Sequence, residues 1–444
     1  MTHRRSRTAL RMSLLGVCVG CGSLAGCVQL EDGASNGVSA RAWAMPERIS
    51  GIDTNGSIAV SSAGDVVVVW NEEGHVRALG YSVQGGWEEE SRQINRGVYA
   101  RDDATVAMDP AGNAIAVWSE YFDFRRIYSA RYSAGSDWRF SERIDDDFTG
   151  GLGPTVSVGA NGTAVAAWAR VAGTGLEVWA NRYSPGSGWG ATARIGGNSV
   201  DEASGVRVAV APDGSATAVW ARSDGGPVGI WANHCSGDGD WGTPSGIGQD
   251  GSGDARSPQV GVDDQGNAIV VWEQFDGSVF DVWSNRYASG AWGAAPSRVE
   301  DFDAGHATDP DIGVAGSGNA VAVWAQSVGS RADLWSSGYT VGLGWGAAER
   351  IESINAASAK GPQVGVDQEG AAVVSWLQSD GTEERIWSNQ YSPSAGWSVA
   401  TAIDSVDRAS PRVPNLTVAR SGLAAIVWGE SGSSATGLWV NRYQ

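Results

Sequence analysis

Carboxylates are the most abundant reactive side chains in this sequence. Its 444 residues carry 50 Asp and Glu against 31 Lys and Arg, with four His and four Cys, and the net charge is -19. Ten acids crowd into segments that lie between apolar runs, namely Asp102, Asp103, Asp145, Asp146, Asp147, Asp201, Glu202, Glu300, Asp301 and Asp303. Calcium needs several converging oxygens, yet no EF-hand-like spacing occurs. The histidines are too scattered for a zinc site. We therefore predict a solvated acidic rim, with no resident metal and no cofactor.

Aromatic rings in the same connecting segments are the second group of candidates. Six of the seven Phe lie there, and Phe140 is the exception. Exposed rings on loops are typical contact anchors. The predicted ligand-binding residues are Tyr121, Phe122, Asp123, Phe124, Arg125, Phe275, Asp276, Phe280 and Phe302. The alternative is that these rings pack against their own loops.

The sequence nominates no catalytic residue. It has no Gly-x-Ser-x-Gly, His-Glu-x-x-His or Walker motif. The turn from Asp263 to Gly266 resembles the Asp-box of sialidase-type propellers, but Trp272 lies six residues after the glycine where that motif has three. Glycoside hydrolysis needs two carboxylates across the bond, and 50 acids give no preferred pair. A sialidase-like glycan hydrolase therefore remains an alternative, and the sequence leans towards a protein that is not an enzyme.

These candidates are set in a repeat. A Trp ends an apolar run eight times, at Trp70, Trp118, Trp168, Trp220, Trp272, Trp324, Trp376 and Trp428, with spacings of 48, 50 and then 52 residues. A fixed period of this size marks a repeat architecture. Within one repeat, residues 258–262, 267–274, 281–287 and 292–299 are predicted as four short antiparallel strands with turns between them. Four-stranded units repeated in this way are typical of propeller blades.

Two further Trp series follow the first. One contains Trp179, Trp231, Trp283, Trp335, Trp387 and Trp439, and the other contains Trp87, Trp138, Trp189, Trp241, Trp292, Trp345 and Trp397. A Tyr recurs four residues after the first of these series, and Cys235 takes its place in the fourth repeat as a buried apolar stand-in. We expect the rings to wedge blades together, although the last series, beside Gly-rich turns, could instead stack on sugars.

The N-terminus completes the last repeat. Residues 43–49 match residues 345–351, so they are expected to supply the fourth strand of the final blade. An open solenoid would instead need polar caps. We predict an all-β fold over residues 41–444: one eight-bladed β-propeller, with four antiparallel strands per blade and a ring closed by the N-terminal strand.

The first 40 residues are an export segment. Arg4, Arg5, Arg7 and Arg11 precede a short apolar stretch, and Leu24-Ala25-Gly26-Cys27 follows. The segment resembles a bacterial lipoprotein signal, which implies removal of residues 1–26 and a lipid on Cys27. Residues 27–40 are predicted to be a flexible tether. Val28 lacks the acidic inner-membrane retention signal, which favours the outer membrane or cell surface. Only Cys235 then remains, so no intramolecular disulfide is possible.

The chain resembles Trp-rich repeat β-propeller lipoproteins of bacteria over residues 41–444. Its architecture resembles the propeller lipoprotein of outer-membrane protein assembly. These likenesses favour a lipid-anchored, non-enzymatic binding or scaffold protein of the cell envelope, a monomer whose partner is a protein or a glycan. The acidic surface argues against nucleic acid and against membrane contact other than the lipid. A multivalent, lectin-like propeller is the main alternative.

Overall fold

The computed structural model describes residues 41–444 apart from 98–99, 101–103, 122, 147–149, 198–201, 224, 249–252, 303–304, 355, 405–409 and 433–435. Cys27, the signal segment and Phe122 lie outside the described residues, as do Asp102, Asp103, Asp147, Asp201 and Asp303. Every regular element of the described part is a strand. No helix there has the length and apolar character needed to cross a membrane.

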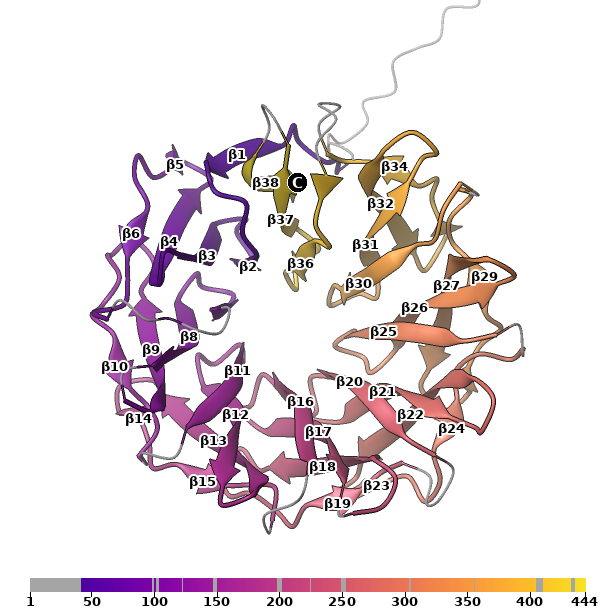
Figure 1. Cartoon of the computed structure of the whole chain (residues 1–444), viewed down its shortest axis with the longest axis horizontal. Helices are drawn as coiled ribbons and strands as arrows, with labels where there is room; N and C mark the ends of the chain where they lie inside the picture. The colour runs from indigo at the N-terminus through magenta and orange to yellow at the C-terminus, as the bar shows by residue number, and fades with distance from the viewer. Residues whose placement is uncertain are drawn as a thin grey trace, which may run out of the picture. The chain divides into compact units, whose positions relative to one another are not determined.

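Eight antiparallel sheets form a ring of blades around a central channel (Figure 1). Blade 1 contains β2 (Gly56–Val60), β3 (Val66–Glu72), β4 (His75–Ser82), β5 (Gly86–Trp87) and β6 (Arg92–Gln93), and blade 2 contains β7 (Thr105–Met108), β8 (Ala114–Tyr121), β9 (Arg125–Tyr132) and β10 (Glu142–Arg143). Blade 3 contains β11 (Gly151–Val158), β12 (Ala164–Ala172), β13 (Gly175–Ser184), β14 (Gly188–Trp189) and β15 (Ala193–Arg194), and blade 4 contains β16 (Glu202–Val210), β17 (Ala216–Ser223), β18 (Gly229–Cys235) and β19 (Ser245–Gly246). The first strand of each blade lies nearest the channel.

Blades 5 to 8 repeat this plan. Blade 5 contains β20 (Ala255–Val262), β21 (Ala268–Phe275), β22 (Phe280–Ala288), β23 (Ala291–Trp292) and β24 (Ser297–Arg298), and blade 6 contains β25 (Ala307–Val314), β26 (Ala320–Val328), β27 (Arg331–Thr340), β28 (Gly344–Trp345) and β29 (Glu349–Arg350). Blade 7 contains β30 (Lys360–Val366), β31 (Ala372–Ser379), β32 (Glu384–Ser392), β33 (Gly396–Trp397) and β34 (Thr401–Ala402), and blade 8 contains β35 (Ser410–Pro411), β36 (Asn415–Val418), β37 (Ala424–Ser431), β38 (Gly437–Tyr443) and β1 (Glu47–Ser50). The predicted eight-bladed fold is confirmed.

The ring closes between β1 and β38, as predicted. Glu47 faces Val440 in an antiparallel ladder, and Trp43 bridges Tyr443. The amide N–H of Ala42 also donates to the carbonyl of Gln444 at 3.0 Å. The two ends of the folded ring therefore share one blade and leave no open sheet edge there.

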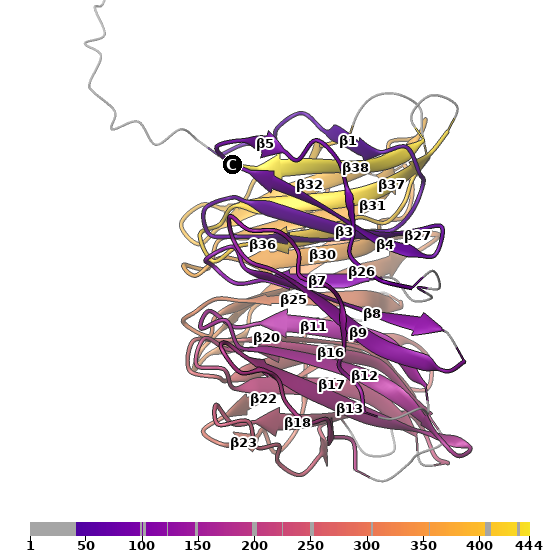
Figure 2. The ribbon, with the colours of Figure 1, turned by 90° about the vertical axis from the view of Figure 1, so that its left-hand side faces the viewer.

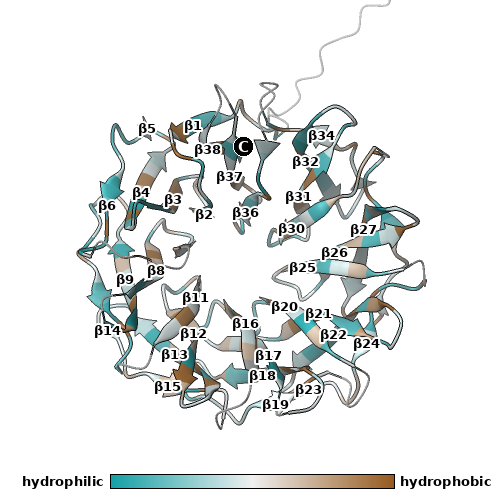
Figure 3. Cartoon of the chain, viewed as in Figure 1, coloured by the Kyte–Doolittle hydropathy of each residue, from teal (hydrophilic) through white to brown (hydrophobic). Residues whose placement is uncertain are grey.

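The outer strand of a blade is less regular than predicted. In blade 5 the expected strand 292–299 is divided into β23 and β24, which both pair with β22. Gly293 and Pro296 lie between them, and a proline has no N–H to donate to a ladder. Figure 3 shows hydrophilic residues on the outer strand β6 and also along inner strands such as β20 and β25.

The core is divided among the blade interfaces. Each of eight apolar clusters joins residues of two neighbouring blades. The first Trp series lies in these clusters with at most 1% of each side chain exposed. Six of these indole N–H groups donate to a Glu or Gln two residues later, as Trp324 does to Gln326 at 3.0 Å. The expected structural role of this series is confirmed.

Candidate functional site

The ring has two distinct faces, which Figure 2 shows from the side. The turns between first and second strands and between third and fourth strands share the short-turn face, where the C-terminus also lies. The connections between second and third strands and between blades share the loop face. Every predicted binding residue that the structure describes lies at the loop face.

The hairpin tip of blade 2 displays two of the predicted rings. Tyr121 is 44% exposed and Phe124 is 50% exposed. Tyr121 pairs with Arg125 where β8 meets β9. A carboxylate oxygen of Asp123 accepts from the Phe124 N–H at 3.0 Å and from Arg126 at 2.9 Å. Asp123 therefore holds Phe124 and Arg126, while the rings of Tyr121 and Phe124 are exposed.

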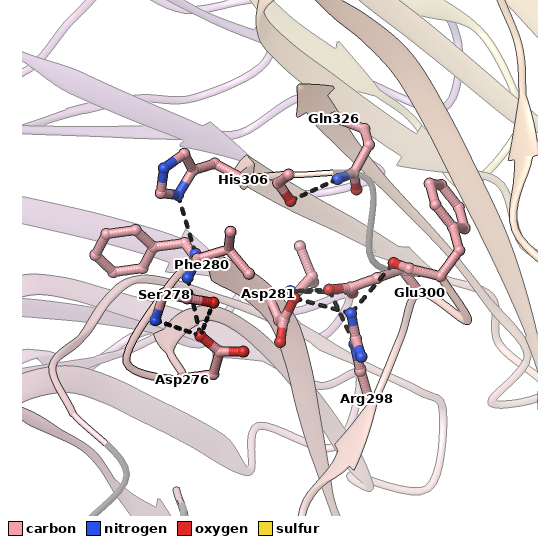
Figure 4. A network of polar contacts seen from close by, with 12 residues as sticks. Asp276, Ser278, Phe280, Asp281, Arg298, Glu300, His306 and Gln326 are labelled. Atoms are coloured by element: carbon pink, nitrogen blue, oxygen red, sulfur yellow. Dashed lines mark hydrogen bonds and ion pairs between the residues drawn. The ribbon is translucent and has the colours of Figure 1, made fainter. Parts of the chain in front are cut away.

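The predicted rings of blade 5 pack against their own surroundings instead. Phe275 and Phe280 have ring centroids 5.2 Å apart, and the Arg256 guanidinium lies 3.9 Å from the Phe280 ring. Figure 4 shows His306, whose Nδ1 accepts from the Phe280 N–H at 3.1 Å. Phe302 similarly lies 4.5 Å from Trp335. The alternative weighed from the sequence, that rings pack against their own loops, holds for the pair Phe275 and Phe280, whereas Phe280 and Phe302 also pack against other segments.

Asp276 orders the turn between β21 and β22. Its carboxylate accepts from the N–H groups of Val279 at 2.8 Å and Ser278 at 2.7 Å. These hydrogen bonds, led by that from Val279, lower the pKa of Asp276 below its usual value. Asp276 therefore shapes the turn.

A buried ionic cluster below this turn was missed by the sequence analysis. Arg298 lies 2.9 Å from Asp281 and 3.3 Å from Glu300, and Figure 4 shows the two carboxylates converging on it. Burial, followed by repulsion from Asp281, raises the pKa of Glu300 to about 8. Glu300 is only 3% exposed, so its assignment to a solvated acidic rim was wrong. The strand pairing of Trp283 with Arg298 brings these groups together.

The candidates of blades 2 and 5 do not form one site. None of the predicted residues that the structure describes lines any of the four cavities considered below. Among the described residues no cluster of three or more His, Cys, Asp or Glu is arranged to hold a metal ion. The hairpin tip of blade 2 therefore stands as a separate exposed surface.

The first cavity, of about 380 Å³, lies in the central channel at the short-turn face. Valines of the inner strands line it, including Val158 and Val210. Arg420 of blade 8 and Asp264 of blade 5 form an ion pair of 2.5 Å. Because this pair joins blades that are not neighbours, it crosses the channel and narrows it at this end.

Three further cavities differ in position. One of about 460 Å³ is lined by residues of blades 7, 8, 1 and 2, including the inner-strand residues Gln363, Ser57 and Thr105. The second, of about 520 Å³, lies between blades 7 and 8, and the third, of about 290 Å³, lies between blades 6 and 7. Trp43 and Tyr443 line the second, and Tyr339 and Tyr391 line the third. The sequence signal for the third is Gly338, which stands where six of the seven other repeats carry a large side chain.

No protein-family model matches the chain, and no curated protein matches it. Solved structures do resemble its fold. An ulvan lyase of a new polysaccharide lyase family matches 81% of this chain and 98% of its own, with 12% identity and a TM-score of 0.50. A protein of unknown function from Dyadobacter fermentans covers 91% and 99%, with 10% identity and a TM-score of 0.45. The Aleuria aurantia lectin, bound to a fucosylated sugar, covers 68% and 95%, with 14% identity and a TM-score of 0.40. At these identities the likeness concerns the propeller fold alone.

Proposed function

We propose that this chain is a lipid-anchored, non-enzymatic binding protein of the bacterial cell envelope that contacts a partner protein through its loop face. The observation that carries the proposal is the exposed pair of rings Tyr121 and Phe124, which lie where β8 meets β9 in blade 2. Aromatic rings held on a rigid scaffold bury a large area at a small cost in conformational entropy.

The position of the first described residues supports this choice of face. Ala42 is hydrogen-bonded to Gln444 at the short-turn face. The described ring therefore begins at the short-turn face, whereas the proposed contact surface lies at the loop face. In the proposal the lipid on Cys27 supplies the only membrane attachment, so Cys27→Ser is expected to abolish labelling by palmitate and to release the protein from membranes.

The loop-face proposal is tested by site-specific cross-linking in the native host. A photoreactive phenylalanine analogue at position 125 would report partners beside the tip and keep the ion pair between Asp123 and Arg126. We expect Tyr121→Ala with Phe124→Ala to reduce the cross-linked product at least tenfold while the circular dichroism spectrum is unchanged. Phe140→Ala is the matched control because Phe140 is also exposed but lies in the third-to-fourth-strand connection of blade 2. Equal loss in both variants, or no loss in the double variant, would refute the proposed surface.

A second candidate, glycan binding, is favoured by the cavity between blades 7 and 8. Trp43 and Tyr443 supply aromatic surface there, and Gln390 and Thr401 supply hydrogen-bonding groups. Sugar sites combine these two features. Residues 41–444 applied to a glycan array, followed by calorimetry of any bound glycan, test this candidate. Binding that Gln390→Ala weakens would support it, whereas binding unaffected by this change would exclude the cavity.

A further inference from the structure

One position at the end of each third strand faces the next blade around the ring. Its occupants are Gly80, Arg131, Arg182, His234, Arg286, Gly338, Gln390 and Arg442. Arg442 lies 3.7 Å from the ring centre of Tyr81, and Arg131 lies 4.9 Å from that of Tyr183. His234 stacks on Tyr287 at 4.3 Å. The fold therefore repeatedly places a cationic or imidazole side chain on the tyrosine of the following blade.

Gly338 leaves this place open between blades 6 and 7. The cavity of about 290 Å³ described above lies beside Gly338 and reaches Tyr391, the tyrosine that a longer side chain would cover. The other glycine of the series differs, because the Glu88 carboxylate accepts from the Gly80 N–H at 3.1 Å and covers that position. A Cβ atom added to Gly338 would meet only the Ala320 carbonyl oxygen, at 4.0 Å.

The interface between blades 2 and 3 is the filled counterpart of this cavity. Seven lining residues are identical at equivalent places: Asn113 and Asn319, Ala114 and Ala320, Tyr132 and Tyr339, Val158 and Val366, Gly162 and Gly370, Tyr183 and Tyr391, and Pro185 and Pro393. Two differences remove a long side chain, Arg131 against Gly338 and Arg139 against Gly346. The other three are Ile115 against Val321, Ser133 against Thr340 and Asn161 against Glu369. The backbone is unchanged, because residue 139 donates to residue 131 at 2.7 Å and residue 346 donates to residue 338 at 2.8 Å. The open cavity therefore has the form left by removing Arg131.

The partners of Arg131 identify what the open cavity would hold. Its guanidinium donates to the Tyr183 hydroxyl at 2.8 Å and lies 3.3 Å from the Glu142 carboxylate. The equivalent residues are Tyr391, which lines the open cavity, and Glu349, which occupies the same register opposite Ser336 that Glu142 has opposite Ser129. Tyr391 supplies a hydroxyl and an aromatic face to the lining, and Glu369 supplies a carboxylate.

Carbonyl oxygens add to this arrangement. Arg182, which occupies the same position in blade 3, donates to the carbonyls of Gly214 and Gly237 in blade 4, each at 2.6 Å. The equivalent residues of blade 7 are Gly370 and Pro393, and both line the open cavity. The turns match, because Gly239 donates to Ser236 and Ala395 donates to Ser392 in the same way.

We propose that the cavity between blades 6 and 7 binds the guanidinium or alkylammonium group of a ligand, in the place that arginine side chains fill at other blade interfaces. The site lies at the short-turn face and does not depend on the loop-face proposal. The net charge of -19 adds a general attraction for cationic ligands. The chemistry is shared by an arginine side chain of a partner protein and by a free organic cation.

Calorimetric titration of residues 41–444 with N-acetyl-arginine amide tests the proposal. We expect saturable binding at one site per chain, at least tenfold weaker binding of the neutral citrulline analogue, and weakening by Glu369→Gln and by salt. Gly338→Arg should fill the cavity from within and lower the affinity at least tenfold. Gln84→Arg changes the net charge equally at an exposed position and should leave binding unchanged.

A reciprocal variant gives a gain of function. Arg131→Gly should open the equivalent cavity beside Tyr183 and Glu142 and raise the stoichiometry from one to two. Agmatine and a short arginine peptide distinguish the two sources: tighter binding of the peptide assigns the site to a protein partner, and tighter binding of agmatine assigns it to a free cation. Absence of saturable binding to the wild-type chain, or binding unaffected by Gly338→Arg, would overturn the proposal. Binding of neutral sugars alone that Gly338→Arg abolishes would also overturn it.

Discussion

Glu300 illustrates how one guanidinium is shared between two buried carboxylates. Arg298 contacts both Asp281 and Glu300, while the Val282 N–H also donates to Glu300 at 2.9 Å. One positive charge cannot compensate both acids in a buried place, which is why the pKa of Glu300 is raised to about 8. Between pH 5 and 8 the folded chain therefore holds a proton that the unfolded chain has lost.

The free energy of unfolding is expected to fall as the pH rises from 5 to 8, by at most about 1.4 kcal/mol per pH unit from this group. Glu300→Gln removes the titration and should flatten the dependence, so that the variant gains stability relative to the wild type towards pH 8. Urea unfolding at several pH values measures this effect. The exposed neighbour Asp301, changed to Asn, is the control. A pH dependence identical in Glu300→Gln and the wild type would contradict the assignment.

Cys235 shows a single residue whose role could be inferred from its place in the repeat. It is fully buried at the position of the recurrent tyrosine, beside Trp241. Burial raises the pKa of its thiol to about 11, although Arg182 acts in the opposite direction. The expectation of a buried apolar stand-in is confirmed, because the environment of a repeat position is set by the blade rather than by the residue that occupies it.

Within a blade, the second strand supplies the buried Trp of the core and also a side chain that hydrogen-bonds to the connection between blades. Gln378 accepts from the Trp376 indole at 2.8 Å and donates to the carbonyls of Ile354 and Ala357. Gln378→Ala should leave these buried groups without this partner and lower the free energy of unfolding by about 1–3 kcal/mol. Gln84→Ala, at an exposed turn, should have no comparable effect in the same urea titration. Equal stability of both variants would show that the network contributes little.

The strands could be predicted because their signals are local and repeated eight times. The loop-face packing could not, because its partners come from other segments: Arg256 and His306 cover Phe280 from different connections. The same local sequence features that suggest an exposed ring are present in Phe124 and Phe280. The two rings differ in their tertiary neighbours, which leave Phe124 of blade 2 exposed and cover Phe280 of blade 5. The cavities between blades could not be predicted either, because residues of the next repeat form part of their lining.

For the ring as a whole, β1 has an effect far beyond its four residues. It covers the outer edge of β38, and Arg442 pairs with Glu47 at 2.6 Å. A chain of residues 51–444 should melt at a lower temperature than residues 41–444 and should self-associate through the exposed edge. Differential scanning calorimetry and light scattering measure both effects. Unchanged melting and a monomeric mass would show that closure does not require this strand.

Closure by the first strand also determines when the molecule can be finished. Glu47 and Arg442 are 395 residues apart in the chain. A ribosome or an export channel delivers the N-terminal strand first, so this strand must wait without its partner until nearly the entire chain has emerged. Premature termination anywhere would then leave an open ring, because only a full-length chain can complete the last blade. Contacts of such long sequence separation also form slowly, so the interval before closure is when chaperones and proteases have their best access.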